Sequence, residues 1–357
     1  MKPIETIKTL KQLDINGLIA KLPIIQGGMG VGVSMSRLAG TVASEGGVGV
    51  ISAAQPGFNW DGFSSNPLKA NLEALAYHIL RAKERAKDGL IGVNIMCAIN
   101  HYAEYVKCAI ENKADLIISG AGLPTKLPEL VKDSAIKIAP IVSSKKAAAV
   151  LLKMWDKKFG KTADMVVIEG PKAGGHLGFS AEDLSKQLDY DNEVLDILQE
   201  VSHYSERYNR VIPTVFAGGV SDNADVQHYM GLGCAGVQVA TKFVATEECD
   251  VADEYKQAYI SATDADVTIV KSPVGMPGRA ISNEFIKGLL TTNRKITECS
   301  NCISTCNPKT IPYCITKALI NAAIGKTNEG LIFCGAYVGR IKEISTVKRV
   351  IAELLPA

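Results

Sequence analysis

The chain has 357 residues, of which 47% are hydrophobic and 21% charged, and its formal net charge is +2 at pH 7. This length suits two average domains or one barrel-sized domain with an insertion. Basic residues are scattered among acidic ones, so the sequence lacks the basic stripe of a nucleic-acid-binding protein, and we expect a small-molecule ligand. No segment approaches the roughly 18 apolar residues of a membrane helix and no secretion signal is evident, so we expect a cytoplasmic protein without a membrane partner.

Eight short apolar runs, most of them closing in glycine or a small polar residue, predict buried strands. In chain order they are Pro23–Met29, Gly47–Ala53, Ile91–Met96, Leu116–Gly122, Ile138–Ser144, Met165–Gly170, Pro213–Gly219 and Gly236–Thr241. Stretches with apolar residues at helical spacing lie between them, at Ser34–Glu45, Leu68–Lys87, Tyr102–Asn112, Lys145–Lys158, Ala181–Glu200 and Asn223–Met230. Eight strand-then-helix units predict an α/β fold, a (β/α)8 TIM barrel. An open doubly wound sheet is the alternative, but Gly28-Met-Gly-Val-Gly32 fits its Gly-x-Gly-x-x-Gly turn poorly.

The alternation of strands and helices stops after the eighth strand. We expect the barrel to occupy residues 1–246 and a helical cap to follow in residues 247–312. This cap region contains a Pro/Gly-rich loop, Ser272–Arg279, and a cysteine cluster. Residues 313–357 contain helical patterns at Ile315–Ile324 and Ile341–Leu355, which we expect to return to the barrel.

His176 is the first catalytic candidate because of its position behind the sixth predicted strand. The apolar run Val166–Ile168 breaks into Glu-Gly-Pro-Lys-Ala-Gly-Gly-His-Leu-Gly178. Parallel strands present polar residues at their C-terminal ends, where α/β proteins bind ligands, and glycine-rich backbone allows a close approach. The alternative is a histidine that only satisfies carbonyl groups of its loop.

Two glycine-containing or small-residue loops follow the seventh and eighth predicted strands, at Ala217–Ser221 and Val239–Phe243. These are the usual phosphate-binding positions of a TIM barrel, because backbone N–H groups and a helix N-terminus can converge there on an anion. For the first loop, the alternative is an ordinary turn in which Ser221 or Asp222 caps the next helix. The two loops together favour a ligand that carries a phosphate.

The cysteine cluster follows the spacing Cys299-x-x-Cys302-x-x-x-Cys306, with Cys314 further on. Closely spaced thiolates are the ligands of zinc and of iron–sulfur clusters, so we consider an Fe–S cluster or Zn as a possible cofactor at these four residues. The alternative is a group of free thiols, because the spacing matches no specific metal signature.

Several motifs carry a family resemblance: Gln26-Gly-Gly-Met29, Gly92-Val-Asn94, Ser119-Gly-Ala-Gly-Leu-Pro124, Ala173-Gly-Gly-His-Leu-Gly178, Ala217-Gly-Gly219 and Gly236-Val-Gln-Val-Ala-Thr241. In this order they resemble the nitronate monooxygenase family, formerly called 2-nitropropane dioxygenases, from about Pro23 to the C-terminus. The set is also similar to flavin-dependent enoyl-acyl-carrier-protein reductases and related NAD(P)H:quinone reductases.

The resemblance implies FMN at the barrel mouth. It implies that the phosphate contacts the loops with Ala217, Gly218, Gly219, Ala240 and Thr241. It places the isoalloxazine ring near Gly28, Met29, Asn94 and Gly122, under the loop that contains Glu169, Gly174 and Gly175. His176 matches the active-site histidine of the family. Many relatives carry an amide side chain where Ala336 stands, so a contact from that side chain is in doubt.

The resemblance implies one of two reactions. In the first, a nitronate is oxidised with O2 to a carbonyl compound and nitrite. In the second, NAD(P)H reduces the flavin, which then reduces an enoyl thioester or a quinone. Arg279 could neutralise an anionic substrate or fasten the cap through acidic side chains. A phosphate-binding aldolase is a further alternative, for which only Lys172 and Lys242 lie near strand ends.

Overall fold

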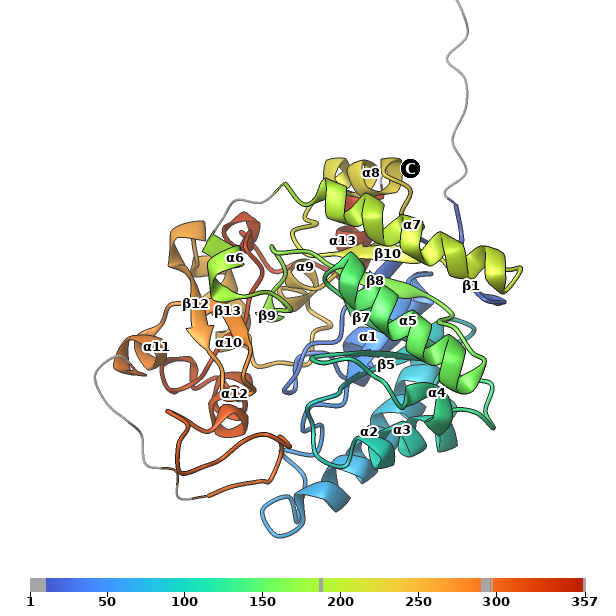
Figure 1. Ribbon diagram of the computed structural model, residues 1–357. Coiled ribbons are helices and arrows are strands. Elements are labelled where there is room, and N and C mark those ends of the chain that lie inside the picture. The colour runs from blue at the N-terminus through green and yellow to red at the C-terminus, as the bar shows by residue number, and fades with distance from the viewer. Residues whose placement is uncertain (1–10, 186–188, 290–295, 297, 356–357) are drawn as a thin grey trace, which may run out of the picture.

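The computed structural model describes residues 11–185, 189–289, 296 and 298–355. Within them, eight parallel strands close into a barrel (Figure 1) in the order β10-β11-β3-β4-β5-β6-β7-β8. These strands are β3 (Ile24–Gln26), β4 (Val48–Ser52), β5 (Leu90–Met96), β6 (Leu116–Gly120), β7 (Lys137–Val142), β8 (Val166–Glu169), β10 (Thr214–Ala217) and β11 (Gly236–Val239). The predicted TIM barrel is confirmed, and each of the eight predicted runs overlaps one of its strands.

The strands bury both of their faces, which explains why they read as continuous apolar runs. In β4, Val48 and Val50 belong to the cluster inside the barrel, whereas Ile51 belongs to the larger cluster between strands and helices. Alternate residues of a strand point to opposite faces, so one run supplies both cores.

An N-terminal hairpin, which the sequence did not predict, contributes to the inner core. Its strands are β1 (Leu13–Ile15) and β2 (Leu18–Ala20), joined by a turn that contains Gly17. Leu13, Ile15 and Ala20 pack in the same cluster as the inward side chains of the barrel. Strands of three residues are too short to show a periodic pattern, which explains why these two strands were not predicted.

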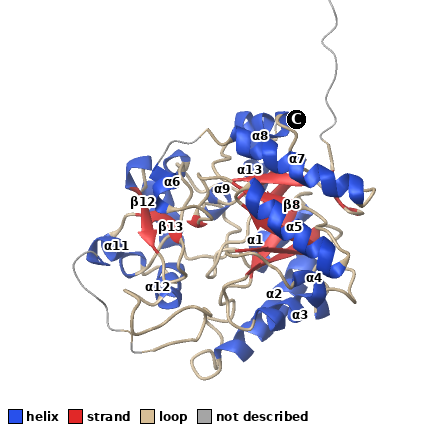
Figure 2. Ribbon diagram, in the orientation of Figure 1, coloured by secondary structure: helices blue, strands red, loops and turns tan. Residues whose placement is uncertain are grey.

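Helices surround the barrel, as Figure 2 shows in blue around the red strands. They are α1 (Ser36–Ser44), α2 (Pro67–Ala86), α3 (Tyr102–Glu111), α4 (Leu127–Leu130), α5 (Lys145–Phe159), α7 (Asp191–Arg207), α8 (Asn223–Gly231), α9 (Thr241–Val244) and α13 (Val347–Leu354). The short helix α6 (Ala181–Ser185) lies instead on the side of the cap strands in Figure 1. The predicted helix Ala181–Glu200 is thus divided between α6 and α7. The C-terminal helix α13 packs on α1, α8 and α9. No helix in the described ranges is long and apolar enough to cross a membrane.

The segment after β11 forms a cap with both helices and strands, seen beside the barrel in Figure 1. Its elements are α10 (Asp253–Ser261), η1 (Asp264–Asp266), β12 (Val267–Lys271), β13 (Pro277–Ile281), α11 (Glu284–Leu289) and α12 (Ile315–Ala323), followed by η2 (Thr327–Glu329) and η3 (Val338–Arg340). The strands form a hairpin that we had not expected in a helical cap. Its β13 pairs with β9 (Gly175–His176), so the cap is joined by a sheet to the loop that carries the candidate histidine.

Candidate active site

A cavity of about 240 Å3 lies where the C-terminal ends of the barrel strands face the cap. All eight barrel strands, or the loops that follow them, contribute to its wall. The cap side adds Tyr255, Tyr259 and Leu319, and the segment before η3 adds Phe333 and Tyr337. This is the edge at which TIM barrels bind their ligands.

The structure brings most of the predicted site residues together in this wall. Those that line the cavity are Gly28, Met29, Asn94, Glu169, Gly174, Gly175, His176, Ala217, Gly218, Gly219, Ala240 and Thr241. Gly122 is the exception: it is exposed, and its carbonyl group accepts a hydrogen bond from the Cys97 thiol at 3.4 Å. Its neighbours Gly120 and Ala121 line the cavity instead.

His176 is held by the cap. Its strand β9 pairs with β13, and its Nε2 shares a hydrogen bond of 2.7 Å with Oγ of Ser272 in the turn between β12 and β13. The ring meets Phe333 edge to face, with 5.0 Å between the ring centroids. Burial lowers the pKa of His176 to about 4, since desolvation disfavours the imidazolium. The side chain is therefore a neutral imidazole at pH 7, fit to donate or accept a hydrogen bond.

Ser272 is a site residue that the sequence did not single out. It is 3% exposed, and its Oγ also accepts the N–H of Val274 at 3.2 Å. The turn is closed by the N–H of Gly275, which donates to the Ser272 carbonyl at 3.0 Å with φ +90° at the glycine. The Pro/Gly-rich loop was visible in the sequence, but its contact with a residue almost one hundred positions earlier was not.

Glu169 ends β8 and ties the histidine loop to the barrel. Its Oε2 accepts the N–H of Gly178 at 3.0 Å and the hydroxyl of Ser143 at 3.3 Å. Burial raises the pKa of this carboxyl to about 7, although the two hydrogen bonds and nearby Arg279 oppose the shift. The cavity wall therefore contains a carboxyl group that changes its charge near neutral pH.

Arg279 fastens the cap, which is one of the two roles that the sequence suggested, but its hydrogen bond goes to a backbone group. It is 7% exposed, and its guanidinium donates a hydrogen bond to the carbonyl of Ala173. The side chain thus fastens the cap strand β13 to the loop between Glu169 and His176 through a backbone group, and Glu169 lies close enough to affect its charge.

The loop after β10 has a backbone shape that only glycine adopts readily. Gly218 and Gly219 have φ values of +111° and +85°. A Cβ atom at Gly218 would lie 2.9 Å from the carbonyl oxygen of Gly170, and one at Gly219 would lie 2.9 Å from Cβ of Lys172. Both residues therefore have backbone conformations that residues with side chains rarely adopt, and a side chain at either position would clash with neighbouring atoms.

Several polar groups at the end of the cavity near β10 and β11 have no hydrogen-bond partner among the described residues. Within the described part of the chain, the N–H groups of Gly218, Gly219 and Ala240 donate to no other protein group. Oε1 of Gln238, which lines the cavity, is buried and likewise lacks a hydrogen-bond partner among the described residues. An unpaired buried acceptor such as Gln238 Oε1 is costly, and the three N–H groups lie on partly exposed residues that line the cavity, so a ligand with both an anionic group and hydrogen-bonding edges fits this end of the cavity.

The late segment Gly335–Tyr337 reaches the same loops. The N–H of Gly335 donates to Oγ1 of Thr241, and the N–H of Ala336 donates to the carbonyl of Lys172, each at 3.1 Å. Ala336 thus contributes a backbone contact to the loop that carries Lys172.

The cysteine cluster is separate from this cavity. Cys299, Cys302, Cys306 and Cys314 are free cysteines, and no group of three or more metal-ligating side chains occurs among the described residues. The structure does not support the expected Fe–S cluster or Zn. The cysteine loop is instead joined to the loop after β5: the N–H of Asn100 donates to the Cys302 carbonyl at 3.0 Å, and the N–H of Ser304 donates to the Ala98 carbonyl at 2.9 Å.

The chain is similar to known proteins over most of its length. It is 27% identical over 301 residues to a "probable nitronate monooxygenase" of Staphylococcus saprophyticus, which covers 76% of this chain and 79% of that protein. The structure resembles FabK from Thermotoga maritima, with 26% identity, a TM-score of 0.71 and coverage of 93% and 91%. A nitroalkane oxidase from Streptomyces ansochromogenes shares the fold at 18% identity, with a TM-score of 0.70 and coverage of 93% and 94%. The sequence profile "Nitronate monooxygenase" matches residues 13–357, and the chain therefore belongs to the nitronate monooxygenase family of flavin-dependent oxidoreductases.

Proposed function

We propose that this protein is an FMN-dependent nitronate monooxygenase that oxidises alkyl nitronates with O2 to carbonyl compounds and nitrite. The observation that carries the proposal is a partly buried, neutral imidazole, His176, in the wall of a cavity that also contains the loops after β10 and β11. The staphylococcal relative named as a probable nitronate monooxygenase supports this reaction.

The residues at the barrel side of the cavity fit FMN. The unpaired N–H groups of Gly218, Gly219 and Ala240 would hold its phosphate, and Oε1 of Gln238 would accept a hydrogen bond from its polar ring edge. FMN, when bound, supplies the redox chemistry, and the protein supplies binding and orientation.

The residues at the cap side would position the substrate. A nitronate carries its negative charge on oxygen atoms, and the neutral His176 would donate a hydrogen bond to one of them. Ser272 fixes the ring through Nε2, so the imidazole is oriented before the substrate arrives. Phe333, Tyr255 and Tyr259 line the same cavity, limit the access of water and would contact the alkyl group.

A second candidate is an NAD(P)H-dependent reductase of an enoyl thioester or a quinone. The glycine-rich motifs that resemble flavin-dependent enoyl-acyl-carrier-protein reductases, among them Ala173–Gly178 and Ala217–Gly219, favour it. In this reaction, NAD(P)H would occupy the cap side before the substrate does, and His176 would serve as a polar group beside the substrate.

The first test is chemical. The purified protein should show the visible absorption of an oxidised flavin, and the flavin released on denaturation should be FMN. Addition of an alkyl nitronate in air should produce nitrite and consume O2. A protein that neither contains nor takes up flavin would refute both candidates, and a flavoprotein that forms no nitrite would leave only the reductase.

A further inference from the structure

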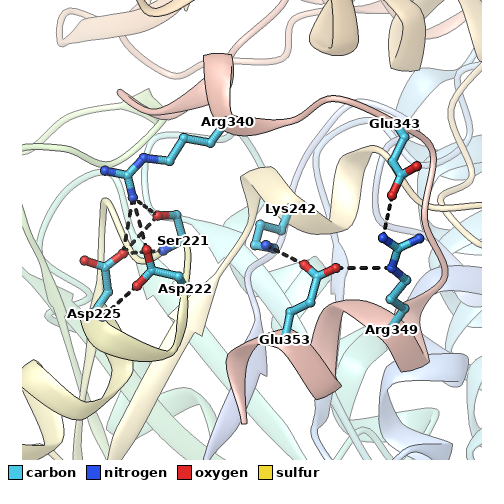
Figure 3. A network of polar contacts seen from close by, with 8 residues as sticks. All are labelled: Ser221, Asp222, Asp225, Lys242, Arg340, Glu343, Arg349 and Glu353. Atoms are coloured by element: carbon cyan, nitrogen blue, oxygen red, sulfur yellow. Dashed lines mark hydrogen bonds and ion pairs between the residues drawn. The ribbon is translucent and has the colours of Figure 1, made fainter. Parts of the chain in front are cut away.

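A cluster of charged side chains surrounds the first phosphate loop (Figure 3). Nη1 of Arg340 donates to Oγ of Ser221 and lies 3.5 Å from Oδ2 of Asp222 and 3.8 Å from Oδ2 of Asp225. The same Asp225 oxygen accepts the N–H of Ser221 at 2.8 Å and its hydroxyl at 2.9 Å. One guanidinium group from the C-terminal segment thus offsets part of the charge of two carboxylates, which lie three and six residues after Gly219 in the chain.

Tyr337 places this guanidinium over the loop. Cζ of Arg340 lies 4.1 Å from the centroid of the Tyr337 ring, and Nζ of Lys172 lies 5.1 Å from the same centroid. A Cβ atom built on Gly219 would lie 3.5 Å from the ring of Tyr337. Arg340, Tyr337 and Lys172 all line the cavity, so the cation is at the phosphate end of the binding site.

The loop after β11, Val239–Phe243, also contains a positively charged side chain, Lys242, which pairs with the C-terminal helix. Lys242 forms an ion pair of 2.8 Å with Glu353 of α13, and Glu353 also contacts Arg349 at 3.3 Å. Arg349 forms a further pair of 2.6 Å with Glu343, as Figure 3 shows. Arg349 does not line the cavity, which makes it a matched arginine for comparison with Arg340.

The charge balance assigns a role to Arg340. An anion bound to the N–H groups of Gly218 and Gly219 would lie near Asp222 and Asp225, which repel it. We propose that Arg340 is a specificity-determining residue for the cofactor: it offsets these carboxylates and so favours a flavin with a terminal phosphate over a flavin without one. The inference rests on the proposed function, because it requires a flavin in this cavity.

The test compares two flavins that differ only in the phosphate. Full-length apoprotein, prepared by reversible removal of flavin, is titrated with FMN and with riboflavin, and binding is followed by the change in flavin fluorescence. Arg340→Gln should weaken FMN binding about tenfold, the usual effect of losing an interaction with a charged group, and leave riboflavin binding unchanged. Arg349→Gln should change neither affinity.

A second variant tests the carboxylates without altering Arg340. Asp222 caps α8 by accepting the N–H of Asp225 at 3.0 Å, and asparagine caps helices equally well. Asp222→Asn should therefore tighten FMN binding, about twofold to threefold for one partly exposed charge, without an effect on riboflavin. Combined with Arg340→Gln, it should restore part of the lost FMN affinity.

Each outcome bears on the inference. If Arg340→Gln weakens both flavins equally, or neither, or if Asp222→Asn leaves FMN binding unchanged, then Arg340 does not act on the phosphate and the inference is overturned. If the wild-type protein binds riboflavin as tightly as FMN, the inference is also overturned, although the protein would still be a flavoprotein. Wild-type protein that binds neither flavin would instead refute the proposed function.

Discussion

The two ends of the cavity are built in different ways. At the phosphate end, the binding groups are backbone N–H groups of loops that follow β10 and β11, and their positions are set by the barrel. At the other end, the binding groups are side chains, and cap residues hold them: Ser272 orients His176, and Arg279 fastens the loop before it. Under the proposed function, the barrel would supply a fixed site for the cofactor, whereas the cap would determine the environment of the substrate.

This difference predicts that changes at the cap end alter turnover and changes at the barrel end alter cofactor binding. His176→Ala should give the largest effect, a loss of turnover of about 100-fold or more with FMN still bound, because positioned polar groups contribute this much to catalysis. Turnover per bound flavin is the measurement. Unchanged turnover in a flavin-loaded variant would contradict the role of His176.

Gly218→Val should mainly weaken cofactor binding, in contrast to His176→Ala, which should mainly lower turnover. Its Cβ would lie 2.9 Å from the Gly170 carbonyl oxygen, and the φ of +111° is unfavourable for a β-branched residue. We expect a loss of FMN affinity of tenfold or more, measured by flavin titration of the apoprotein. Gly231→Val, on the end of α8 where no atom lies within 4 Å of the added Cβ, is the control for a general effect of the substitution. Equal effects of the two substitutions would refute a specific role of the Gly218 loop.

Ser272→Ala should reduce turnover by about fivefold to tenfold, since it removes one hydrogen bond to His176. The pKa of His176, measured by NMR titration of the ring, should also change, because the loss of the hydroxyl alters the environment of Nε2. If Ser272 only stabilises the turn between β12 and β13, the substitution should lower thermal stability and leave the pKa of His176 unchanged. The two measurements therefore distinguish a role in the turn from a role in orienting His176.

The raised pKa of Glu169 should make the stability of the folded protein depend on pH. Its pKa in the folded protein is about 7, above the ordinary value of 4.5, so the carboxyl favours folding most below pH 4.5, and this contribution is lost as the pH rises through 7. Glu169→Gln should remove this loss. Between pH 5 and pH 8, the free energy of unfolding of the variant should therefore fall by less than that of wild type, with a difference of up to about 3 kcal/mol. Urea unfolding at both pH values measures it. The exposed Glu73→Gln is the control, and identical pH profiles for wild type and Glu169→Gln would contradict the assignment.

The two ends of the site also differed in how much the sequence revealed. The strands, the glycine loops and His176 were predictable, because hydrophobic runs that end in glycine mark the C-terminal edge of a barrel. Ser272 and Gln238 were not predicted as site residues, since their roles depend on contacts with distant segments or on a missing partner. The β12–β13 hairpin was interpreted as part of a helical cap because only one strand of the pair has a clear apolar run. The cysteine spacing suggested a metal that the arrangement of the four thiols does not support.

The most direct test of the proposed function is to mix the oxidised flavoprotein with an alkyl nitronate in the absence of O2 and to record the visible absorption of the flavin. We predict that the nitronate bleaches the oxidised flavin band and that NAD(P)H does not. Prompt bleaching by NAD(P)H, with no change on addition of the nitronate, would contradict the monooxygenase assignment and identify the protein as a reductase.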